Sequence, residues 1–275
     1  LAGLHFYRRC LELEDKYNRK NVKIEHALQT NGYLLDPQWC SFFAEHRFLI
    51  GLFVDGIKAT HDAYRRDAEG KETYFHMLKA AELLKAAGAE FNVLTVVNGK
   101  TAPKIGRIYE NYRKLGFRWQ QYIACLDPVR ERQGEQDYSL TAGVYGRFLI
   151  DLFELWYLDL CKGQQPYIRQ FENYVGILMG QIPESCEQRG VCSFHNVVEA
   201  DGSVYPCDFY CMDEYRVGNL NEDSFEDLQK RLLESGFLQV STEHEPQCAE
   251  CSYFGICRGG CRRHRERQAS VSAVF

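Results

Sequence analysis

The sequence has no long hydrophobic run and no excess of positive charge. Its richest apolar stretch, residues 47–54, falls well short of the roughly 18 consecutive apolar residues that a membrane-spanning helix needs. The 33 Lys and Arg residues stand against 38 Asp and Glu, a net charge of -5 that argues against a nucleic-acid-binding surface. We therefore expect neither a membrane nor a nucleic-acid partner, and a hydrophobic content of 45% predicts a globular core.

Cysteine is scarce in the first two thirds of the chain and abundant afterwards. Four of the 12 cysteines, Cys10, Cys40, Cys125 and Cys161, precede residue 185, and the other eight follow it. Because no signal peptide is recognisable, a secreted disulfide-rich domain is disfavoured, and we expect a cytoplasmic protein. The cysteine-rich end is then best interpreted as a metal-binding region.

Apolar runs of strand type alternate with segments of helical periodicity in the first region. Such an alternation predicts a parallel sheet with right-handed crossovers, either an α/β barrel or a doubly wound sheet. The four expected β/α units pair strand 22–28 with helix 36–46, strand 48–54 with helix 73–87, strand 90–97 with helix 102–115, and strand 118–123 with helix 141–161.

Ligands of such sheets bind at the carboxyl ends of the strands. The residues that follow the expected strands are therefore candidates for a site, although each of them taken alone fits ordinary turn chemistry equally well. They are residues 29–31, 55–66, 98 and 125–128.

The sequence pattern changes between residues 165 and 185. After that point it predicts short strands and turns and is rich in cysteine. Residues 197–205 predict a hairpin around Asp201-Gly202, and residues 224–235 predict a short helix that begins at a Ser cap. We expect two domains, 1–170 and 171–275.

The spacing of four cysteines, Cys248-x2-Cys251-x5-Cys257-x3-Cys261, brings several thiolates together at one or two metal centres. Thiolates alone do not distinguish zinc from an iron–sulfur cluster.

Several segments together resemble a known family. Cys192, Cys207 and the four cysteines above follow the pattern of the SPASM domain, which carries auxiliary [4Fe-4S] clusters in peptide-modifying radical S-adenosylmethionine enzymes. The chain more closely resembles the anaerobic sulfatase-maturating enzymes, through residues 28–32 (LQTNG), 54–56 (VDG), 125–128 (CLDP), 201–210 (DGSVYPCDFY) and 257–263 (CRGGCRR).

The resemblance implies a partial (β/α)6 radical-SAM barrel, with about four β/α units present, followed by the SPASM domain. It implies oxidation of a Cys or Ser of a sulfatase polypeptide to Cα-formylglycine, started by a radical generated from S-adenosylmethionine. By motif position Asp208 would be the acid–base residue, and burial beside a cluster could raise its proton affinity.

The resemblance also implies two groups of metal ligands and a set of cofactor contacts. Cys186, Cys192, Cys207 and Cys261 would hold a first auxiliary [4Fe-4S] cluster, while Cys248, Cys251 and Cys257 would hold a second. Cys211 has no place in this pattern and is expected to be a small buried side chain. The expected contacts to S-adenosylmethionine are Asn31, Phe53, Arg65 and Leu126, with Phe53 standing where the family often has a small hydroxyl residue.

The Cys-x3-Cys-x2-Cys motif that binds the radical-generating cluster does not occur in the sequence, nor does the Gly-Gly-Glu-Pro segment. We therefore expect a fragment that lacks segments at both ends, is inactive alone, and comes from a monomeric maturase. Two alternatives remain at this stage: another SPASM enzyme acting on a ribosomal peptide, and a non-catalytic zinc or cluster scaffold that binds a peptide.

Overall fold

The computed structural model describes residues 2–128, 132 and 134–265. The chain divides into two compact units, Leu1–Asp127 with Gly134–Gln170, and Pro128–Gln133 with Phe171–Phe275.

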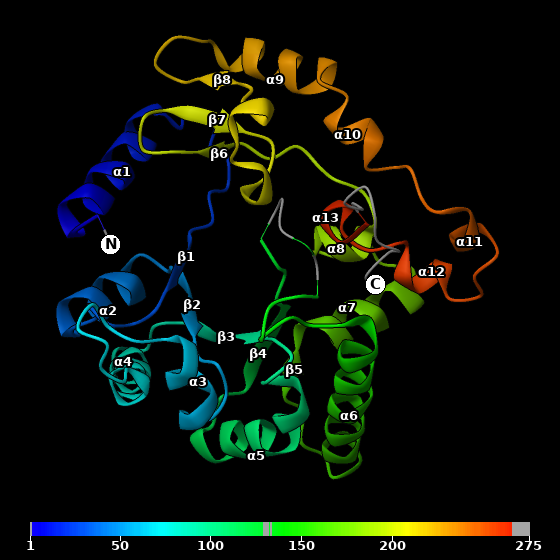
Figure 1. Ribbon diagram of the computed structural model, residues 1–275. Helices are drawn as coiled ribbons and strands as arrows, with labels where there is room; N and C mark the ends of the chain where they lie inside the picture. Colours follow the sequence, from blue (N-terminus) through cyan, green and yellow to red (C-terminus); the bar gives the residue numbers. More distant parts are fainter. Residues whose placement is uncertain (1, 129–131, 133, 266–275) are drawn as a thin grey trace. The chain divides into compact units, whose positions relative to one another are not determined.

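The first unit is built on a five-stranded parallel sheet, in the order β1-β2-β3-β4-β5 (Figure 1). Neighbouring strands pair in chain order, which is the arrangement that successive β/α units produce. The predicted α/β class and the partial barrel are thereby confirmed. The strands are β1 (Ala27–Thr30), β2 (Leu49–Phe53), β3 (Phe91–Val97), β4 (Trp119–Ala124) and β5 (Tyr167–Ile168).

Local signals in the sequence set the ends of the helices in this unit. The Asp36 side chain accepts a hydrogen bond from the Trp39 amide and Pro37 occupies the first turn, so α2 begins there. Gly88 and Gly116 adopt left-handed backbone conformations that end α4 and α5. The helices are α1 (Leu4–Tyr17), α2 (Pro37–Glu45), α3 (Lys58–Tyr64), α4 (Tyr74–Ala87), α5 (Ile105–Leu115) and α6 (Ala142–Cys161), with a 3-10 turn at Ala102–Lys104.

Three expectations about these elements were wrong in part. The first strand begins at Ala27 instead of residue 22, and β5 was not expected at all. The loop expected over residues 55–72 contains α3, whose buried side chains Thr60, His61 and Asp62 are polar. A helix that buries polar groups shows no apolar periodicity, so the sequence pattern did not predict it.

The segment after β2 is fixed by a close approach to α5. The Gly56 amide donates a hydrogen bond to the Tyr112 hydroxyl at 2.9 Å, and that hydroxyl donates to the Val54 carbonyl. Gly56 has φ = +84°, and a Cβ atom there would lie 2.5 Å from Cγ1 of Ile108. Only glycine fits this turn without strain, so the chain after β2 is held against the core.

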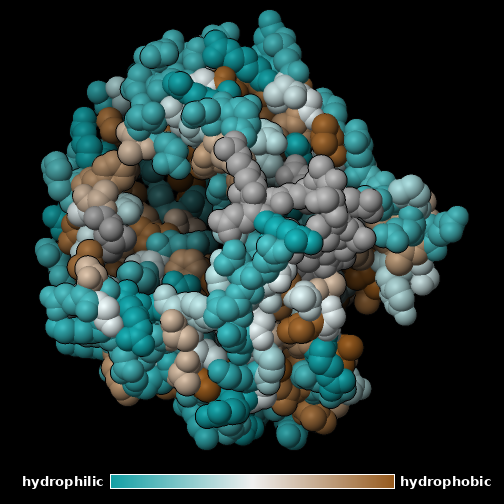
Figure 2. Space-filling model, in the orientation of Figure 1, coloured by the Kyte–Doolittle hydropathy of each residue, from teal (hydrophilic) through white to brown (hydrophobic). Residues whose placement is uncertain are grey.

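Helix α6 buries Phe148, Leu152 and Trp156 and leaves Ile150 and Leu158 exposed. Apolar patches appear in the region of α6 in Figure 2 (brown, lower right). None of the helices described is both long enough and apolar enough to cross a membrane.

The second unit has a small antiparallel sheet and short helices. Strands β6 (Val197–Val198), β7 (Ser203–Tyr205) and β8 (Gly218–Asn219) pair in that order, which confirms the expected hairpin. The side chains of Tyr210, Leu232 and Phe237 form a core against which Cys192 and Cys207 pack. The helices are α7 (Arg169–Leu178), which starts at the end of the first unit, α8 (Cys186–Arg189), α9 (Phe225–Glu234), α10 (Phe237–Val240), α11 (Pro246–Ala249), α12 (Phe254–Cys257) and α13 (Arg262–Arg265), with 3-10 turns at Asp208–Tyr210 and Asp213–Tyr215.

Candidate functional site

At the carboxyl end of β2 the structure brings two of the expected cofactor contacts together. Phe53 is the last residue of β2, and Arg65 follows α3 directly. The Cζ atom of Arg65 lies 4.6 Å from the centre of the Phe53 ring, within cation–π range. The guanidinium also forms an ion pair with Asp55, a residue that the sequence analysis placed only within a candidate loop.

The other two expected contacts follow other strands of the sheet. Asn31 follows β1 and accepts a hydrogen bond from the Tyr33 amide at 3.1 Å, which is ordinary turn chemistry. Leu126 follows β4 and is half-buried. Within the described part of the chain, neither side chain forms a hydrogen bond or an ion pair with Arg65, so their common site stays a prediction.

Four of the seven expected metal ligands affect one another electrostatically. Burial, together with the charges of Cys186 and Cys192, raises the pKa of the Cys261 thiol to about 11. Burial also raises the pKa of Cys207 to about 12, with Asp208 and Cys261 adding to the shift. Thiols of this kind lose their protons when a positively charged iron centre compensates the thiolate charge.

The expected ligands are all thiols, a donor set that an iron–sulfur cluster takes. All twelve cysteines are free thiols, which disfavours a disulfide-stabilised domain. Within the described part of the chain, no three His, Cys, Asp or Glu side chains stand close enough to hold one metal ion.

The remaining three expected ligands lie on one short stretch of the second unit. Cys248 is in α11 and Cys257 ends α12, while the Cys251 amide donates a hydrogen bond to the Cys248 carbonyl at 3.3 Å. Cys251 and Cys257 are exposed. Cys211 is half-buried and its thiol lies 3.7 Å from the Cys207 carbonyl, so the expectation that this side chain is buried was wrong in part.

Asp208 lies next to the first group of cysteines. The Cys207 thiol donates a hydrogen bond to its Oδ1 atom at 3.2 Å, so a carboxylate directly contacts one of the expected cluster ligands. Asp208 is exposed, and the expectation that burial acts on this carboxylate was therefore wrong.

Comparison with known proteins identifies the family. A cysteine-type anaerobic sulfatase-maturating enzyme from Clostridium novyi is 40% identical over 266 residues, which cover 97% of this chain and 71% of that protein. This chain belongs to the anaerobic sulfatase-maturating enzymes. The cysteine-type enzyme of Clostridium perfringens is 41% identical over 97% of the chain, and the serine-type enzyme of Klebsiella aerogenes is 32% identical over 96% of it.

Solved structures and a family model agree with this assignment to the maturases. Native anSMEcpe with bound AdoMet matches with a TM-score of 0.93 and 40% identity, over 99% of this chain and 74% of that one. The same protein has been solved with AdoMet and the Cp18Cys peptide. Residues 186–252 match the SPASM iron-sulfur cluster-binding domain. Streptococcus suis SuiB, at 14% identity and a TM-score of 0.54, shares the fold alone.

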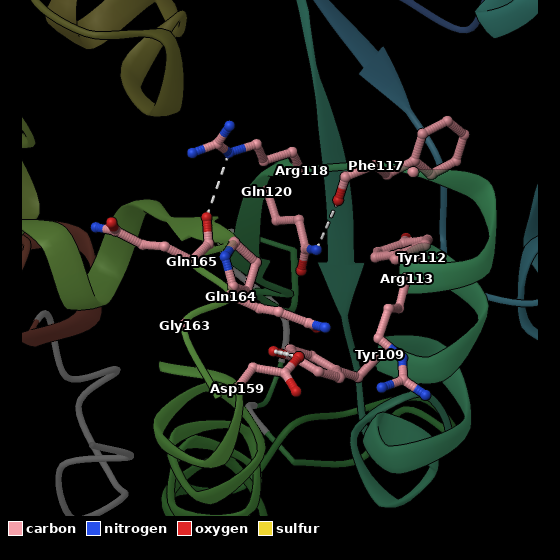
Figure 3. Close-up of a pocket in the computed structure, with 12 residues that line it drawn as sticks. Tyr109, Tyr112, Arg113, Phe117, Arg118, Gln120, Asp159, Gly163, Gln164 and Gln165 are labelled. Carbon is pink, nitrogen blue, oxygen red and sulfur yellow. Dashed lines mark hydrogen bonds between the residues drawn. The ribbon is translucent and has the colours of Figure 1, made fainter. Parts of the chain in front are cut away.

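A cavity of about 360 Å³ lies away from the strand-end residues of this maturase, beside the amino end of β4 (Figure 3). The Tyr109 hydroxyl donates a hydrogen bond at 2.8 Å to the buried carboxylate of Asp159, linking α5 to α6. The Gln120 side chain donates to the Phe117 carbonyl at 2.8 Å. The cavity therefore lies at the end of the sheet opposite to the one where ligands of α/β barrels bind.

Asp55 and His61 were expected only as members of the candidate range 55–66, without roles of their own. Each residue of that range, taken alone, fitted ordinary turn chemistry equally well. An acidic residue directly after the expected strand 48–54, with arginine ten residues later, was the available signal.

Proposed function

We propose that this protein takes part in the oxidation of a cysteine or serine in a sulfatase polypeptide to Cα-formylglycine, with S-adenosylmethionine and [4Fe-4S] clusters as cofactors. The observation that carries the proposal is the 40% identity to cysteine-type maturases over nearly the whole chain. The grouping of thiols beside a carboxylate in the second unit supports it independently.

The cysteines divide into the two groups of ligands that such clusters need. Cys186, Cys192, Cys207 and Cys261 would hold one auxiliary cluster, and Cys248, Cys251 and Cys257 would contribute to another. A bound auxiliary cluster supplies an acceptor for the electrons that leave the substrate as its carbon is oxidised. The sequence contains no Cys-x3-Cys-x2-Cys motif, so no residue here is assigned to the radical-generating cluster.

The chain's own residues have separate tasks in this proposal. Asp208 accepts the proton of the substrate thiol or hydroxyl, because an exposed carboxylate beside a cluster ligand can reach a bound peptide. Arg65, with Phe53 beneath its guanidinium, binds an oxygen of S-adenosylmethionine, either the methionine carboxylate or a ribose hydroxyl. Asn31 and Leu126 complete the cofactor contacts.

A cysteine target is favoured over a serine target. Identity is 40–41% to the cysteine-type relatives and 29–32% to the serine-type relatives. We further propose a monomer with two domains, 1–170 and 171–275, acting in the cytoplasm, where reducing conditions keep cluster cysteines as free thiols.

The test uses the complete gene product, reconstituted anaerobically with iron and sulfide and supplied with S-adenosylmethionine. Matched sulfatase-motif peptides carry Cys or Ser at the target position, and mass spectrometry follows formylglycine. The proposal predicts formylglycine with faster turnover of the Cys peptide. Cofactor cleavage without any change in either peptide would overturn the substrate assignment.

A further inference from the structure

The Asp55 carboxylate is fixed more firmly than a loop residue usually is. Asp55 is 6% exposed and lies two residues beyond β2. Its Oδ1 atom accepts a hydrogen bond from the Val96 amide of β3 at 2.9 Å. Its Oδ2 atom accepts from Nε of Arg65, and Nη2 of Arg65 lies 3.4 Å from Oδ1. A strand backbone therefore sets the position of the carboxylate that binds the arginine.

A second chain of hydrogen bonds holds the backbone of Arg65. The Asp55 amide donates to Nδ1 of His61 at 3.2 Å, so the proton of the neutral imidazole is on Nε2. Nε2 of His61 lies 3.2 Å from the Thr73 hydroxyl, and that hydroxyl donates to the Arg65 carbonyl at 2.8 Å. Asp55 and Arg65 are thus connected through both their side chains and their backbones.

The ion pair leaves part of the guanidinium free to bind a ligand. Arg65 has five N–H donors, of which Asp55 engages those of Nε and one of Nη2. Both hydrogens of Nη1 have no acceptor among the described residues. One face of the guanidinium packs on Phe53, and the side chain is about one quarter exposed. The arginine is therefore ordered, yet it keeps donors available at the carboxyl end of the sheet.

We propose that Asp55 is a positioning residue, which holds the Arg65 guanidinium in the orientation that binds S-adenosylmethionine. The inference rests on the proposed function, in which Arg65 contacts this cofactor. A free arginine side chain loses rotamer entropy when it binds an anion or a hydroxyl group, and this loss weakens the affinity. Because Asp55 has already ordered the side chain, cofactor binding avoids most of that loss.

The experiment measures binding instead of turnover. Equilibrium dialysis gives the Kd of S-adenosylmethionine for the cluster-reconstituted complete gene product and for Asp55→Asn, Arg65→Gln and the double variant. We expect each single change to raise Kd by about tenfold, the equivalent of one charge-assisted hydrogen bond. The double variant should bind no more weakly than Arg65→Gln, because Asp55 acts only through Arg65.

Two further variants separate positioning from general stability. Asp62→Asn removes a neighbouring buried charge whose carboxylate accepts from the Thr73 and Tyr74 amides, both at 3.0 Å. It should lower Tm and leave Kd within about twofold of the wild-type value. Asp55→Glu keeps the negative charge in a larger side chain, so it should bind the cofactor more tightly than Asp55→Asn even where its Tm is lower. It also keeps the test available if Asp55→Asn does not fold.

The outcomes distinguish this inference from the function on which it rests. A wild-type Kd for Asp55→Asn, beside a raised Kd for Arg65→Gln, overturns the positioning role and leaves the proposed function intact. A wild-type Kd for Arg65→Gln removes Arg65 from the cofactor site, and the role of Asp55 falls with it. 5′-Methylthioadenosine, which lacks the methionine carboxylate, shows which oxygen Arg65 binds: an equal loss of affinity for both ligands indicates the ribose.

Discussion

The guanidinium of Arg65 lies over the aromatic ring of Phe53, with its Cζ atom 4.6 Å from the ring centre. The sequence resemblance implies a small hydroxyl residue at this position in many members of the family. In this protein an aromatic ring stands there instead and packs against one face of the Arg65 guanidinium. The strand-end site therefore orients Arg65 with two groups, the Asp55 carboxylate and the Phe53 ring.

Replacing Phe53 tests this support. Phe53→Leu keeps an apolar side chain and removes the aromatic face, so we expect the Kd of S-adenosylmethionine to rise by about threefold, in line with a half-exposed cation–π contact. Phe53→Tyr keeps the face and is the matched control, with an expected Kd close to that of the wild type. Equal affinities of the Leu and Tyr variants for S-adenosylmethionine would show that the side chain contributes only apolar volume and not an aromatic face.

Two neighbouring cysteines give a matched pair for the cluster assignment. Cys207→Ser replaces an expected ligand, and Cys211→Ser changes a half-buried thiol four residues away. We expect Cys207→Ser to lose about one cluster's iron and its share of the absorbance near 400 nm, because an alcohol is a poor ligand for iron in such clusters. Cys211→Ser should keep the wild-type iron content. Equal iron contents in the two variants would contradict the ligand set.

Asp208→Asn separates the proton-transfer role from cluster binding. The amide is nearly isosteric with the carboxylate but does not accept the substrate proton, so we expect peptide oxidation to fall by about a hundredfold or more. Iron content and cleavage of S-adenosylmethionine should persist. Oxidation within about threefold of the wild-type rate would exclude Asp208 as the base.

The stability of the hydrogen-bond network that connects Asp55 with Arg65 should depend on the protonation of His61. Burial lowers the pKa of this histidine from its usual value of 6.5, and the charge of Arg65 lowers it further, while the carboxylates of Asp55 and Asp62 oppose the shift. The Tyr74 ring also packs against the imidazole, at a centroid distance of 5.7 Å. A protonated Nδ1 could no longer accept from the Asp55 amide, so the network requires the neutral ring.

The sign of this pH dependence follows from linkage. Between the lowered folded pKa and the unfolded value near 6.5, the unfolded chain binds more protons, so the free energy of unfolding rises with pH. The stabilisation is complete above about pH 6.5 and is lost as the pH falls through the folded pKa. Urea unfolding of the wild type and of His61→Asn should show a steeper pH dependence in the wild type below pH 6.5. Parallel curves would contradict a role for the neutral imidazole.

Sequence patterns predicted those elements that bury apolar side chains at regular spacing. Helix α4 and strand β3 were located to within a residue or two, because Leu84, Val93 and similar residues repeat with the expected periods. Helix α3 and the two-residue strand β5 carry no such pattern. Their positions depend on polar contacts and on pairing with β4, and neither is visible in local sequence.

The candidate site was predictable to a similar extent. Cysteine spacing and the segment around Asp208 indicated the cluster region, because ligands of one centre recur at short intervals. The contact of Arg65 with Asp55 depends on the return of α3 to the end of β2, and the exposure of Asp208 depends on how its 3-10 turn packs. Tertiary packing of this kind follows from the fold and not from spacing along the chain.

The most direct test of the central claim follows a hydrogen atom from the substrate. A sulfatase-motif peptide with deuterium at Cβ of its target cysteine is incubated anaerobically with the reconstituted complete gene product and S-adenosylmethionine. The account predicts that deuterium appears in 5′-deoxyadenosine while the peptide acquires the mass of formylglycine. Unlabelled 5′-deoxyadenosine together with an unchanged peptide would contradict assignment of this protein's activity to sulfatase maturation.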